Sequence, residues 1–507
     1  MNRETNLKSV STRSEPWDII VIGGGATGAG CALDAASRSF DVLLLEQHDF
    51  GKGTSSRSTK LIHGGVRYLR QGNISLVREA LKERGILLKN APHVVHKQEF
   101  VIPCYSVWQK YFYGLGMKIY DLLAGTYGLG SSRVLNQCEM LEQLPNLDQK
   151  GLKGGVLYYD GQFDDTRLLI DILQSADAHG AAVLNYARVN AFGKDSDGAI
   201  ESVEFIDEET GIEHTVRTRS IINATGVFCD SLRGMADENT KPLLTYSQGI
   251  HLVFNRKFLA GDAALMIPKT SDGRVLFCIP WNDHLLVGTT DTPVESARLE
   301  PKALDAEIDF VLETAGEFLA TKPTRSDVLS VFAGIRPLIK SGHSEKTSAL
   351  SRGHEIFVDA SKMITITGGK WTTYRKMAED AVNRAIEISH FDRKPCITET
   401  LKITEQLAGS LDQVGELLHP ELPYTSADVV RAVRVEMART VEDVLARRTR
   451  ALFLNAKAAT EMAPKVAEII AGELDSDKDW IKDQLVKYER TAQGFMIDKS
   501  HSARELR

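Results

Sequence analysis

Residues 18–46 read DIIVIGGGATGAGCALDAASRSFDVLLLE, and this stretch decides the fold. The β-branched run over 18–22 predicts a buried parallel strand. Gly23, Gly25 and Gly28 then form G-x-G-x-x-G, in which the first glycine allows a tight turn, the second admits a pyrophosphate and the third lets a helix pack on the strand. The small residues of 29–37 predict that helix, whose first N–H groups would point at the phosphates.

A second predicted strand, 42–45, ends in Glu46, eighteen positions after Gly28. A carboxylate at this place can accept hydrogen bonds from the ribose 2′-OH of an adenosine, and it repels a 2′-phosphate. Strand, glycines, helix, strand and acid in this order predict a dinucleotide-binding unit. The alternative is a glycine turn in an ordinary βαβ unit.

Length and composition set the broad class. The chain has 507 residues, of which 43% are hydrophobic and 25% charged, so we expect two or three globular domains. A net charge of −7 gives no footprint for nucleic acid. The six cysteines contain no C-x-x-C pair, which predicts neither a disulfide framework nor a metal site and favours a reducing cytoplasm. Residues 1–16 lack the apolar core of a signal peptide, and no apolar run is long enough to span a membrane.

The next stretch, residues 47–70, reads QHDFGKGTSSRSTKLIHGGVRYLR. Its hydroxyl groups could bind phosphate or the edge of a flavin, although a solvated loop with helix N-caps is the alternative. The pair of glycines after His63 would let the backbone approach a flat group. We therefore assign this loop to cofactor binding, through Thr54, Ser55, Ser58, Lys60, His63, Gly64 and Gly65.

The motifs GGGATGAG and TSSRSTKLIHGGVRYL resemble those of the FAD-dependent glycerol-3-phosphate dehydrogenases, the membrane-associated enzymes that pass electrons to quinone. SQGIHLVF, VGTTD, VFAGIRPL and LSRGHEI match the same family in order, so the resemblance covers most of residues 17–380. It implies an α/β protein with a discontinuous, Rossmann-like FAD domain of the two-dinucleotide-fold type, a β-rich substrate domain and an all-helical C-terminal cap. The expected boundaries are 17–90, 150–240 and 350–390 for the FAD domain, 91–149 and 241–349 for the substrate domain, and 396–507 for the cap.

Two further pieces of the FAD site follow from the resemblance. SIINATG, residues 220–226, would bring Ala224 and Gly226 near the cofactor. MITITGGKWTTYR, residues 363–375, predicts a strand, Gly368-Gly369, and a helix that begins near Lys370 and includes Thr372. That helix N-terminus would point N–H donors at the pyrimidine end of the isoalloxazine; an ordinary β-turn-α connection is the alternative. No comparably good second G-x-G-x-x-G is present, so we expect one dinucleotide, non-covalent FAD.

The chemistry needs a hydride acceptor and a base for the hydroxyl proton. Flavin N5 would supply the first, and His251 is the leading base because of its ordinary pKa. Arg336 could hold or polarise the substrate oxygen. A phosphate dianion needs fixed cations and hydrogen-bond donors. The substrate-binding candidates in the matching motifs are Arg67, Tyr68, Arg336, Arg352, Lys370 and Thr290.

The resulting hypothesis is oxidation of sn-glycerol 3-phosphate to dihydroxyacetone phosphate, with electrons passed to a membrane quinone. The alternatives are a glycerol-3-phosphate oxidase that reduces O2 to hydrogen peroxide, and a non-catalytic FAD electron-transfer protein. We expect a homodimer, peripheral on the inner face of the cytoplasmic membrane. Residues 107–123, VWQKYFYGLGMKIYDLL, form an aromatic and basic helical pattern that suits a membrane interface or, alternatively, packing on the sheet.

The remaining elements are expected from periodicity. Residues 73–89 predict a helix, 183–218 a β-meander, and 241–337 mostly strands. Beyond about 395 the pattern predicts helices over 401–418, 425–454, 461–474 and 480–487. The mitochondrial members of the family carry calcium-binding EF-hands after this cap; no such loop motif occurs here, so calcium control is not expected.

Overall fold

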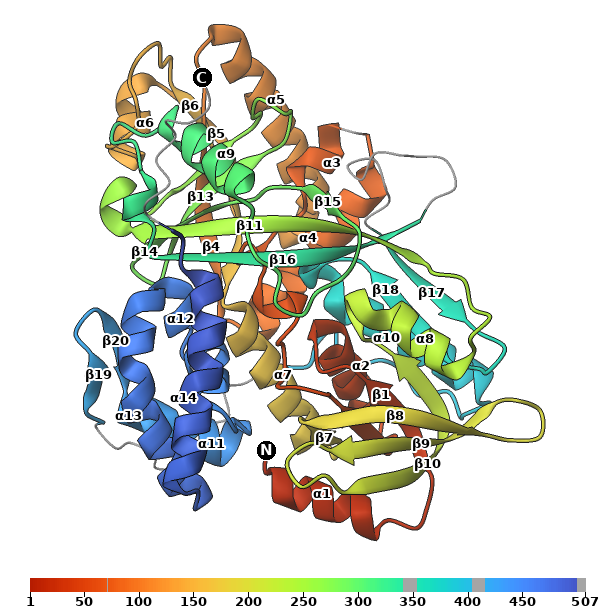
Figure 1. Ribbon diagram of the computed structural model, residues 1–507. Helices are drawn as coiled ribbons and strands as arrows, with labels where there is room; N and C mark the ends of the chain where they lie inside the picture. The colour runs from red at the N-terminus through yellow and green to blue at the C-terminus, as the bar shows by residue number, and fades with distance from the viewer. Residues whose placement is uncertain (71, 341–352, 404–414, 499–507) are drawn as a thin grey trace.

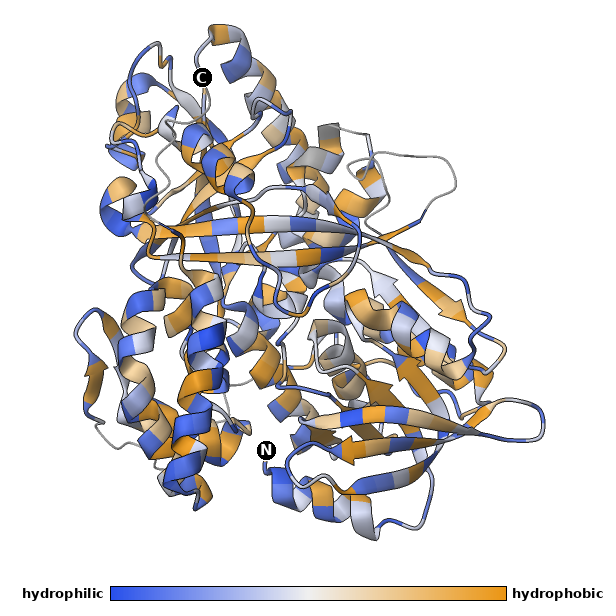
Figure 2. Ribbon diagram, in the orientation of Figure 1, coloured by the Kyte–Doolittle hydropathy of each residue, from blue (hydrophilic) through white to orange (hydrophobic). Residues whose placement is uncertain are grey.

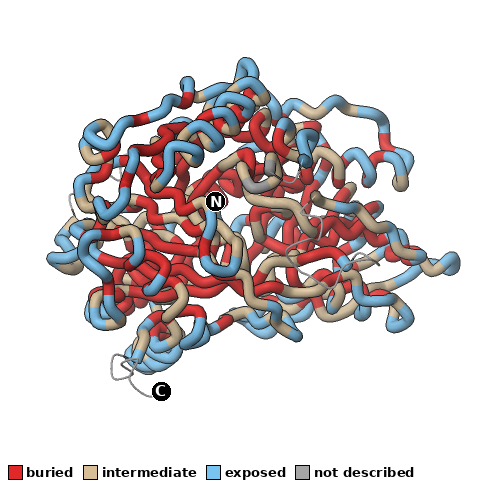
Figure 3. The backbone as a smooth tube through the Cα atoms, turned by 90° about the horizontal axis from the view of Figure 1, so that it is seen from above, coloured by how far each residue is buried: buried red, intermediate tan, exposed pale blue. Residues whose placement is uncertain are grey.

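The computed structural model describes residues 1–70, 72–340, 353–403 and 415–498. Two large sheets lie one above the other in Figure 1, and the C-terminal helices stand beside both. Seen along the perpendicular direction in Figure 3, buried chain fills the interior and exposed chain forms the rim. The mixed α/β architecture with a helical C-terminal region confirms the predicted fold class.

The first sheet is built around β1 (Trp17–Ile22), which is parallel to both of its neighbours. Its central strands are apolar and appear orange in Figure 2, because both faces are covered. In sheet order the strands are β17 (His354–Val358), β18 (Ile364–Gly368), β10 (Glu213–Asn223), β1, β2 (Val42–Leu45) and β7 (Ala182–Leu184). β8 (Ala187–Lys194) and β9 (Ile200–Asp207) pair antiparallel and join this sheet through β10, as the predicted meander requires.

Helices cover the first sheet. α2 (Ala26–Ser37) contacts both α7 (Asp165–Ala178) and α10 (Tyr374–Ile388), and its alanines and glycines make that close approach possible. The other described helices of residues 1–400 are α1 (Arg3–Thr12), α3 (Val66–Arg70), α4 (Ile74–Asn90), α5 (Val107–Ala124), α6 (Gln137–Gln143), α8 (Cys229–Ala236) and α9 (Asp305–Gly316).

The second sheet contains the long pair β11 (Leu244–Asn255) and β16 (Ser330–Ile339), which run antiparallel over ten residue pairs. The path from β11 continues through β14 (His284–Gly288), β13 (Leu276–Trp281), β12 (Ala264–Ile267), β4 (Val95–Pro103), β6 (Gly155–Phe163) and β3 (Leu61–Ile62). β15 (Thr292–Val294) flanks β11, and β5 (Arg133–Leu135) flanks β6. This sheet matches the strands expected over 241–337.

Two strands lie in the second sheet although their residues were expected in the FAD domain. β6 pairs with β4 along its whole length, and β3 pairs with β6. Residues 61–62 and 155–163 are therefore paired with the second sheet and not with the sheet around β1. The reason is long-range pairing: β6 is apolar enough to suit either sheet, and β4 provides a partner of equal length.

The C-terminal region is mainly helical. It contains α11 (Ser426–Glu436), a π-helical turn (Asp443–Arg448), α12 (Ala451–Leu454), α13 (Ala456–Leu474) and α14 (Lys478–Ala492). Instead of one helix over 425–454, the chain breaks at Met437 and Arg450, which both have positive φ. Of the predicted helix 401–418, residues 404–414 lie outside the described ranges, and 417–419 form strand β19 (Leu417–His419), paired with β20 (Leu422–Thr425).

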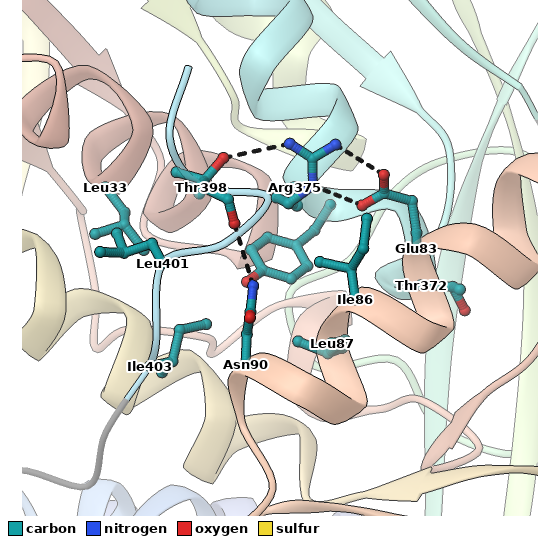
Figure 4. A pocket seen from close by; sticks show the side chains of 12 residues that line it. Leu33, Glu83, Ile86, Leu87, Asn90, Thr372, Arg375, Thr398, Leu401 and Ile403 are labelled. Carbon is teal, nitrogen blue, oxygen red and sulfur yellow. Dashed lines mark hydrogen bonds and ion pairs between the residues drawn. The ribbon is translucent and has the colours of Figure 1, made fainter. Parts of the chain in front are cut away.

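The segment that leads to the C-terminal region is hydrogen-bonded to α4 and α10. Around a space of about 10 Å³, Arg375 of α10 holds Glu83 of α4 through two hydrogen bonds of 2.7 and 2.8 Å and also reaches Thr398 (Figure 4). Asn90 donates to the Thr398 carbonyl. A space of this size holds at most one water molecule, so this cluster is a structural joint.

Candidate active site

The glycine turn between β1 and α2 has the geometry that its motif predicts. Gly23 has φ of +111°, where a side chain would be strained. A Cβ on Gly28 would lie 1.8 Å from the Gly23 carbonyl oxygen, so this position admits only glycine. Ser55 accepts a hydrogen bond of 2.9 Å from the Ala26 N–H at the start of α2. The turn thus leaves backbone donors at a helix N-terminus facing a cavity.

Glu46 follows β2 and reaches back to this turn. Its carboxylate accepts hydrogen bonds from the N–H groups of Gly24 (2.7 Å) and His48 (2.9 Å). Burial raises the pKa of Glu46, and these two hydrogen bonds oppose the rise. A carboxylate can accept about four hydrogen bonds, so the two made here leave capacity for hydroxyl groups of a ribose.

A first cavity of about 230 Å³ lies over the turn. It is lined by the glycine turn, by the acid after β2 and by the end of β10, which are far apart in sequence. The predicted residues on its wall are Gly23, Gly25, Glu46, Thr54, Ser55, Ala224 and Gly226. The glycine turn, the acid after β2 and the predicted piece at 224–226 therefore meet at this cavity, whereas no residue of the predicted piece 363–375 lines it.

A second cavity, of about 310 Å³, lies between the two sheets, and Thr54 lines both cavities. This second wall combines the loop after β2, strands β11 and β16, and the turn after β18. The predicted residues on it are Ser58, His63, Gly65, Tyr68, His251, Thr290, Arg336, Gly369, Lys370 and Thr372. Together the two cavities, which share Thr54, contain most of the predicted cofactor-binding and substrate-binding residues that the structure describes.

His251 is buried on β11, at the wall of the second cavity. Its Nε2 lies 2.9 Å from the Thr59 hydroxyl, and its ring stacks on Phe332 with centroids 4.9 Å apart. Burial and the positive charges of Lys60 and Arg336 hold the pKa of His251 well below its usual value. The imidazole is therefore neutral at pH 7 and can accept a proton.

Arg336 comes from β16, the strand beside β11. One of its terminal nitrogens donates to the Thr289 hydroxyl and to the Thr290 carbonyl, each at 3.1 Å. The other lies 3.5 Å from Asp291, whose carboxylate also accepts a hydrogen bond from Ser247. A guanidinium held on several sides in this way presents a fixed positive charge next to His251.

The turn after β18 closes the same cavity. Lys370 Nζ lies 4.1 Å from the ring centroid of Tyr68, so a cation and a phenol stand together on one wall. Trp371 donates to the Ser55 carbonyl at 2.8 Å, and Thr372 accepts a hydrogen bond of 3.2 Å from the His63 N–H. These contacts fix the turn to the loop after β2. Predicted residues from both segments are thus brought together.

Some predicted site residues have other partners. Lys60 lines neither cavity: it is fully buried and pairs with Asp165 at 2.5 Å. The Ser58 hydroxyl also donates to Asp165, and the Thr290 hydroxyl donates to Glu307. The backbone N–H of Gly64 donates to Tyr120, and Gly368 packs against residue 353. The polar groups of these residues therefore bond to neighbouring protein groups, although Ser58 and Thr290 also line the second cavity.

Two substrate-binding predictions lie outside the described residues: Arg352, and the side chain of Arg67, whose backbone is part of α3. Conversely, the motifs did not single out two cavity residues. Thr59 bonds to His251, and only its place in the hydroxyl-rich run could have indicated this. Arg274 lines the second cavity after the Asp272-Gly273 turn, and that turn was the available signal.

Among the residues that the structure describes, no three His, Cys, Asp or Glu side chains are placed to hold a metal ion. The described helices also include none that is long and apolar enough to cross a membrane.

Comparison with known proteins gives matches over most of the chain. A family described as "FAD dependent oxidoreductase" matches residues 18–375. A second, described as "C-terminal domain of alpha-glycerophosphate oxidase", matches residues 364–480. The two matches overlap at β18 and the turn after it, and together they span both cavities and most of the C-terminal helices.

Several relatives are similar over nearly the whole chain. A probable mitochondrial glycerol-3-phosphate dehydrogenase of Caenorhabditis elegans is 39% identical over 93% of this chain and 72% of its own length. The mitochondrial glycerol-3-phosphate dehydrogenase of Rattus norvegicus is 38% identical over 94% of this chain and 72% of its own. The glycerol-3-phosphate dehydrogenase of Bacillus halodurans, solved in complex with FAD, aligns with a TM-score of 0.78 at 29% identity and covers 99% of both chains.

Proposed function

Because the chain belongs to the family of FAD-dependent glycerol-3-phosphate dehydrogenases, we propose that it oxidises sn-glycerol 3-phosphate to dihydroxyacetone phosphate and passes the electrons to a membrane quinone. FAD is the cofactor of this family. The single observation that carries the substrate proposal is the wall of the second cavity, which combines the cationic side chains Arg336 and Lys370 with the neutral imidazole of His251.

The residues of the first cavity fit FAD. The glycine turn offers backbone donors to a pyrophosphate, and Glu46 offers oxygen acceptors to a ribose. The second cavity begins at Thr54 and has room for a flat ring system. When bound, the isoalloxazine supplies the acceptor for a hydride. We propose that FAD is held non-covalently, through the backbone donors of the glycine turn and the carboxylate of Glu46.

His251 is the proposed base. Oxidation of a secondary alcohol removes the C2 hydrogen as hydride and the hydroxyl hydrogen as a proton. A neutral imidazole at the cavity wall can take that proton at Nε2, in exchange for its hydrogen bond to Thr59. Arg336 lies within the same wall, and its positive charge would stabilise negative charge that develops on the substrate oxygen.

The phosphate group would be bound by the remaining cationic and hydroxyl groups of the cavity. Lys370 and Tyr68 stand together on one wall, and Arg274 lines the cavity on the side of the second sheet. Such a set favours a dianionic phosphate ester over glycerol itself, because fixed cations gain most from a doubly charged ligand.

A membrane partner is supported by α5. Its outer face is apolar and unusually exposed: Trp108 is 75% and Leu122 is 80% exposed. The other exposed residues of this face are Val107, Tyr111, Phe112, Leu115 and Ile119. Lys110 and Lys118 flank it. An aromatic face flanked by lysines suits the headgroup region of an anionic membrane, so we propose that α5 rests on the inner face of the cytoplasmic membrane and brings the enzyme to its quinone.

Oxygen is the competing acceptor, since the C-terminal family match is described by an α-glycerophosphate oxidase. A glycerophosphate oxidase of Mycoplasma pneumoniae shares the fold, with a TM-score of 0.59 at 17% identity. A dehydrogenase and an oxidase would both reduce the flavin with glycerol 3-phosphate. They would differ in the acceptor that reoxidises it, a quinone in the dehydrogenase and oxygen in the oxidase.

The deciding experiment is anaerobic. The FAD-loaded enzyme is mixed with glycerol 3-phosphate, with glycerol or with inorganic phosphate, and the oxidised flavin absorbance is followed. We expect bleaching by glycerol 3-phosphate alone. Oxygen is then admitted in one sample and a quinone analogue in another. Fast recovery with the quinone and slow recovery with oxygen supports the dehydrogenase; fast recovery with oxygen and formation of hydrogen peroxide identifies an oxidase. Flavin that stays oxidised with glycerol 3-phosphate contradicts the substrate.

A further inference from the structure

Lys60 is an ionisable group buried behind the active site. It has φ of +61°, and its side chain is fully inaccessible to solvent. The ammonium group pairs with Asp165 at 2.5 Å and donates to the Ser56 carbonyl at 2.8 Å. It also lies between 5.2 and 5.5 Å from three ring centroids, those of Trp281, Phe332 and Phe453. Burying an ammonium group costs free energy of folding, which its ion pair and hydrogen bond must offset.

Asp165 joins this cation to the loop that carries Thr59. Besides Lys60, it accepts hydrogen bonds from the Ser58 N–H (3.2 Å) and hydroxyl (2.7 Å). Arg450, from the C-terminal region, lies 3.3 Å from the same carboxylate and donates to the Ser56 carbonyl at 2.8 Å. The loop is therefore fixed at residues 56, 58 and 60, on both sides of Thr59.

The same layer supports His251. The Thr59 hydroxyl lies 2.9 Å from its Nε2, and Phe332 stacks against its ring. Phe332 is also one of the rings around the Lys60 ammonium group. His251 and Lys60 therefore share one aromatic neighbour and are joined along the chain by Thr59.

We propose that Lys60 is a positioning residue for the reaction: held by Asp165, which Arg450 also contacts, it fixes Thr59 against His251 and keeps a positive charge behind the imidazole, so that His251 stays neutral and able to accept the substrate proton. This inference rests on the proposed function, because the substrate hydroxyl is the proton donor. The ionisation of His251 itself can be measured without any substrate.

The charges around His251 agree with this role. Lys60 faces it from the 56–60 loop and Arg336 from β16. Asp165 is the partner of Lys60 and is shared with Arg450, and Asp291 is the partner of Arg336. Burial, together with Arg450, lowers the pKa of Lys60 to about 7, against the effect of Asp165. Below pH 7 the group of Lys60, Asp165 and Arg450 thus carries a net positive charge, in the range where an ordinary histidine would become protonated.

The test is the ionisation of His251, read directly. The FAD-loaded enzyme, with ¹³C-labelled histidine, is titrated without substrate, and the His251 resonance among the 13 histidines is assigned by its loss in H251Q. We expect His251 to remain neutral well below pH 6.5 in the wild type. In Lys60→Met its titration, and the acid limb of the kcat/KM profile, should move up by about one pH unit because a positive neighbour is lost.

The matched control is Lys97→Met, which removes an exposed lysine that also lies over an aromatic ring, 3.7 Å from the centroid of Tyr159. It should leave both pH readings unchanged. A Lys60→Met enzyme whose activity falls evenly at all pH values, with the His251 titration unmoved, contradicts the proposal. If that variant does not retain FAD, the test uses the wild type: a midpoint of the His251 titration at or above pH 6.5 overturns the proposal. An enzyme that ignores glycerol 3-phosphate while His251 stays neutral refutes only the proposed function.

Discussion

His251 and His214 make similar ring contacts in different places. Each stacks on a phenylalanine with centroids 4.9 Å apart, His251 on Phe332 in the cavity wall and His214 on Phe205 in the meander. H251Q should lower kcat by about 10²–10⁴-fold, because it removes the base without removing the cofactor site. H214Q is the control and should keep wild-type turnover. Anaerobic stopped-flow reduction of the flavin measures both, and unchanged flavin reduction in H251Q would assign the base elsewhere.

Gly28 gives a second prediction about a single residue. A Cβ at this position would lie 1.8 Å from the Gly23 carbonyl oxygen, so Gly28→Ala must displace the turn at which we propose that the pyrophosphate binds. We expect Gly28→Ala to purify with little or no FAD, measured as the ratio of flavin to protein absorbance. Gly234→Ala is the control, because a Cβ there meets nothing within 4 Å. Full FAD content in Gly28→Ala would show that the turn can adapt.

At this scale the sequence predicts backbone-determined positions better than side-chain directions. Gly23, Gly28 and Glu46 stand where their motif requires, since the turn geometry itself demands these residue types. Lys60 lies in the second motif, TSSRSTKLIHGGVRYL, and points into a buried ion pair. Its positive φ and its partner Asp165, more than a hundred residues away, are products of tertiary packing that local pattern does not contain.

Helices and strands provide the next scale, and α5 carries the prediction. If its exposed face rests on a membrane, Leu115→Glu with Leu122→Glu should weaken sedimentation with anionic phospholipid vesicles by about tenfold or more, since two apolar contacts are replaced by charges. Turnover with a soluble electron acceptor should not change. Val486→Glu on α14, a residue 58% exposed, is the control for adding charge to an exposed apolar site. Equal vesicle binding by all variants would refute the role of α5.

Periodicity predicts most elements but not which sheet or helix they join. The bounds expected for 42–45 are observed, and the helix expected over 107–123 is observed as Val107–Ala124. In contrast, β6 lies in the second sheet, and the helix expected over 425–454 is interrupted at Met437 and Arg450. Those breaks allow three arginines to form ion pairs with carboxylates that are distant in sequence. Arg447 and Arg448 pair with Asp49, and Arg450 pairs with Asp165.

On the scale of the whole molecule, buried ion pairs join the C-terminal region to the FAD domain. Asp49, three residues after Glu46, pairs with Arg447 and Arg448. Glu442 accepts hydrogen bonds from Lys52 at 3.0 Å and from Arg447 at 2.8 Å. Both carboxylates are therefore kept ionised by neighbouring cations. Their ion pairs join residues 442–448 of the C-terminal region to residues 49–52 after β2.

Glu442→Gln tests this connection and its pH dependence. The two cations lower the pKa of Glu442 to about 2. In the unfolded chain this pKa is about 4.3, so the stabilisation is complete above that value and is lost as pH falls toward 2. We expect Glu442→Gln to lose about 3 kcal/mol of unfolding free energy at pH 7, and the gap to the wild type to close in acid.

Urea denaturation at pH 7, 5, 4 and 3 measures that gap. Glu387→Gln is the control, because Glu387 forms an exposed pair with Arg384. It should differ from the wild type by less than about 1 kcal/mol at every pH. A Glu442→Gln deficit that is the same at pH 7 and pH 3 would exclude the carboxylate charge as its source.

The strand order around β1 also has a consequence for how the protein is made. β10 and β18 complete the sheet that begins at residue 17, and Arg450 grips the loop at Ser56 and Asp165. Once the loop that ends at residue 60 has been made, some 390 further residues, from 60 to 450, must be added before these contacts with Arg450 can form. At ordinary elongation rates this takes about 20 to 80 seconds. For part of that interval the apolar strands β1 and β2 lack β10 and β18 as neighbours, so their surface is exposed to non-native contacts.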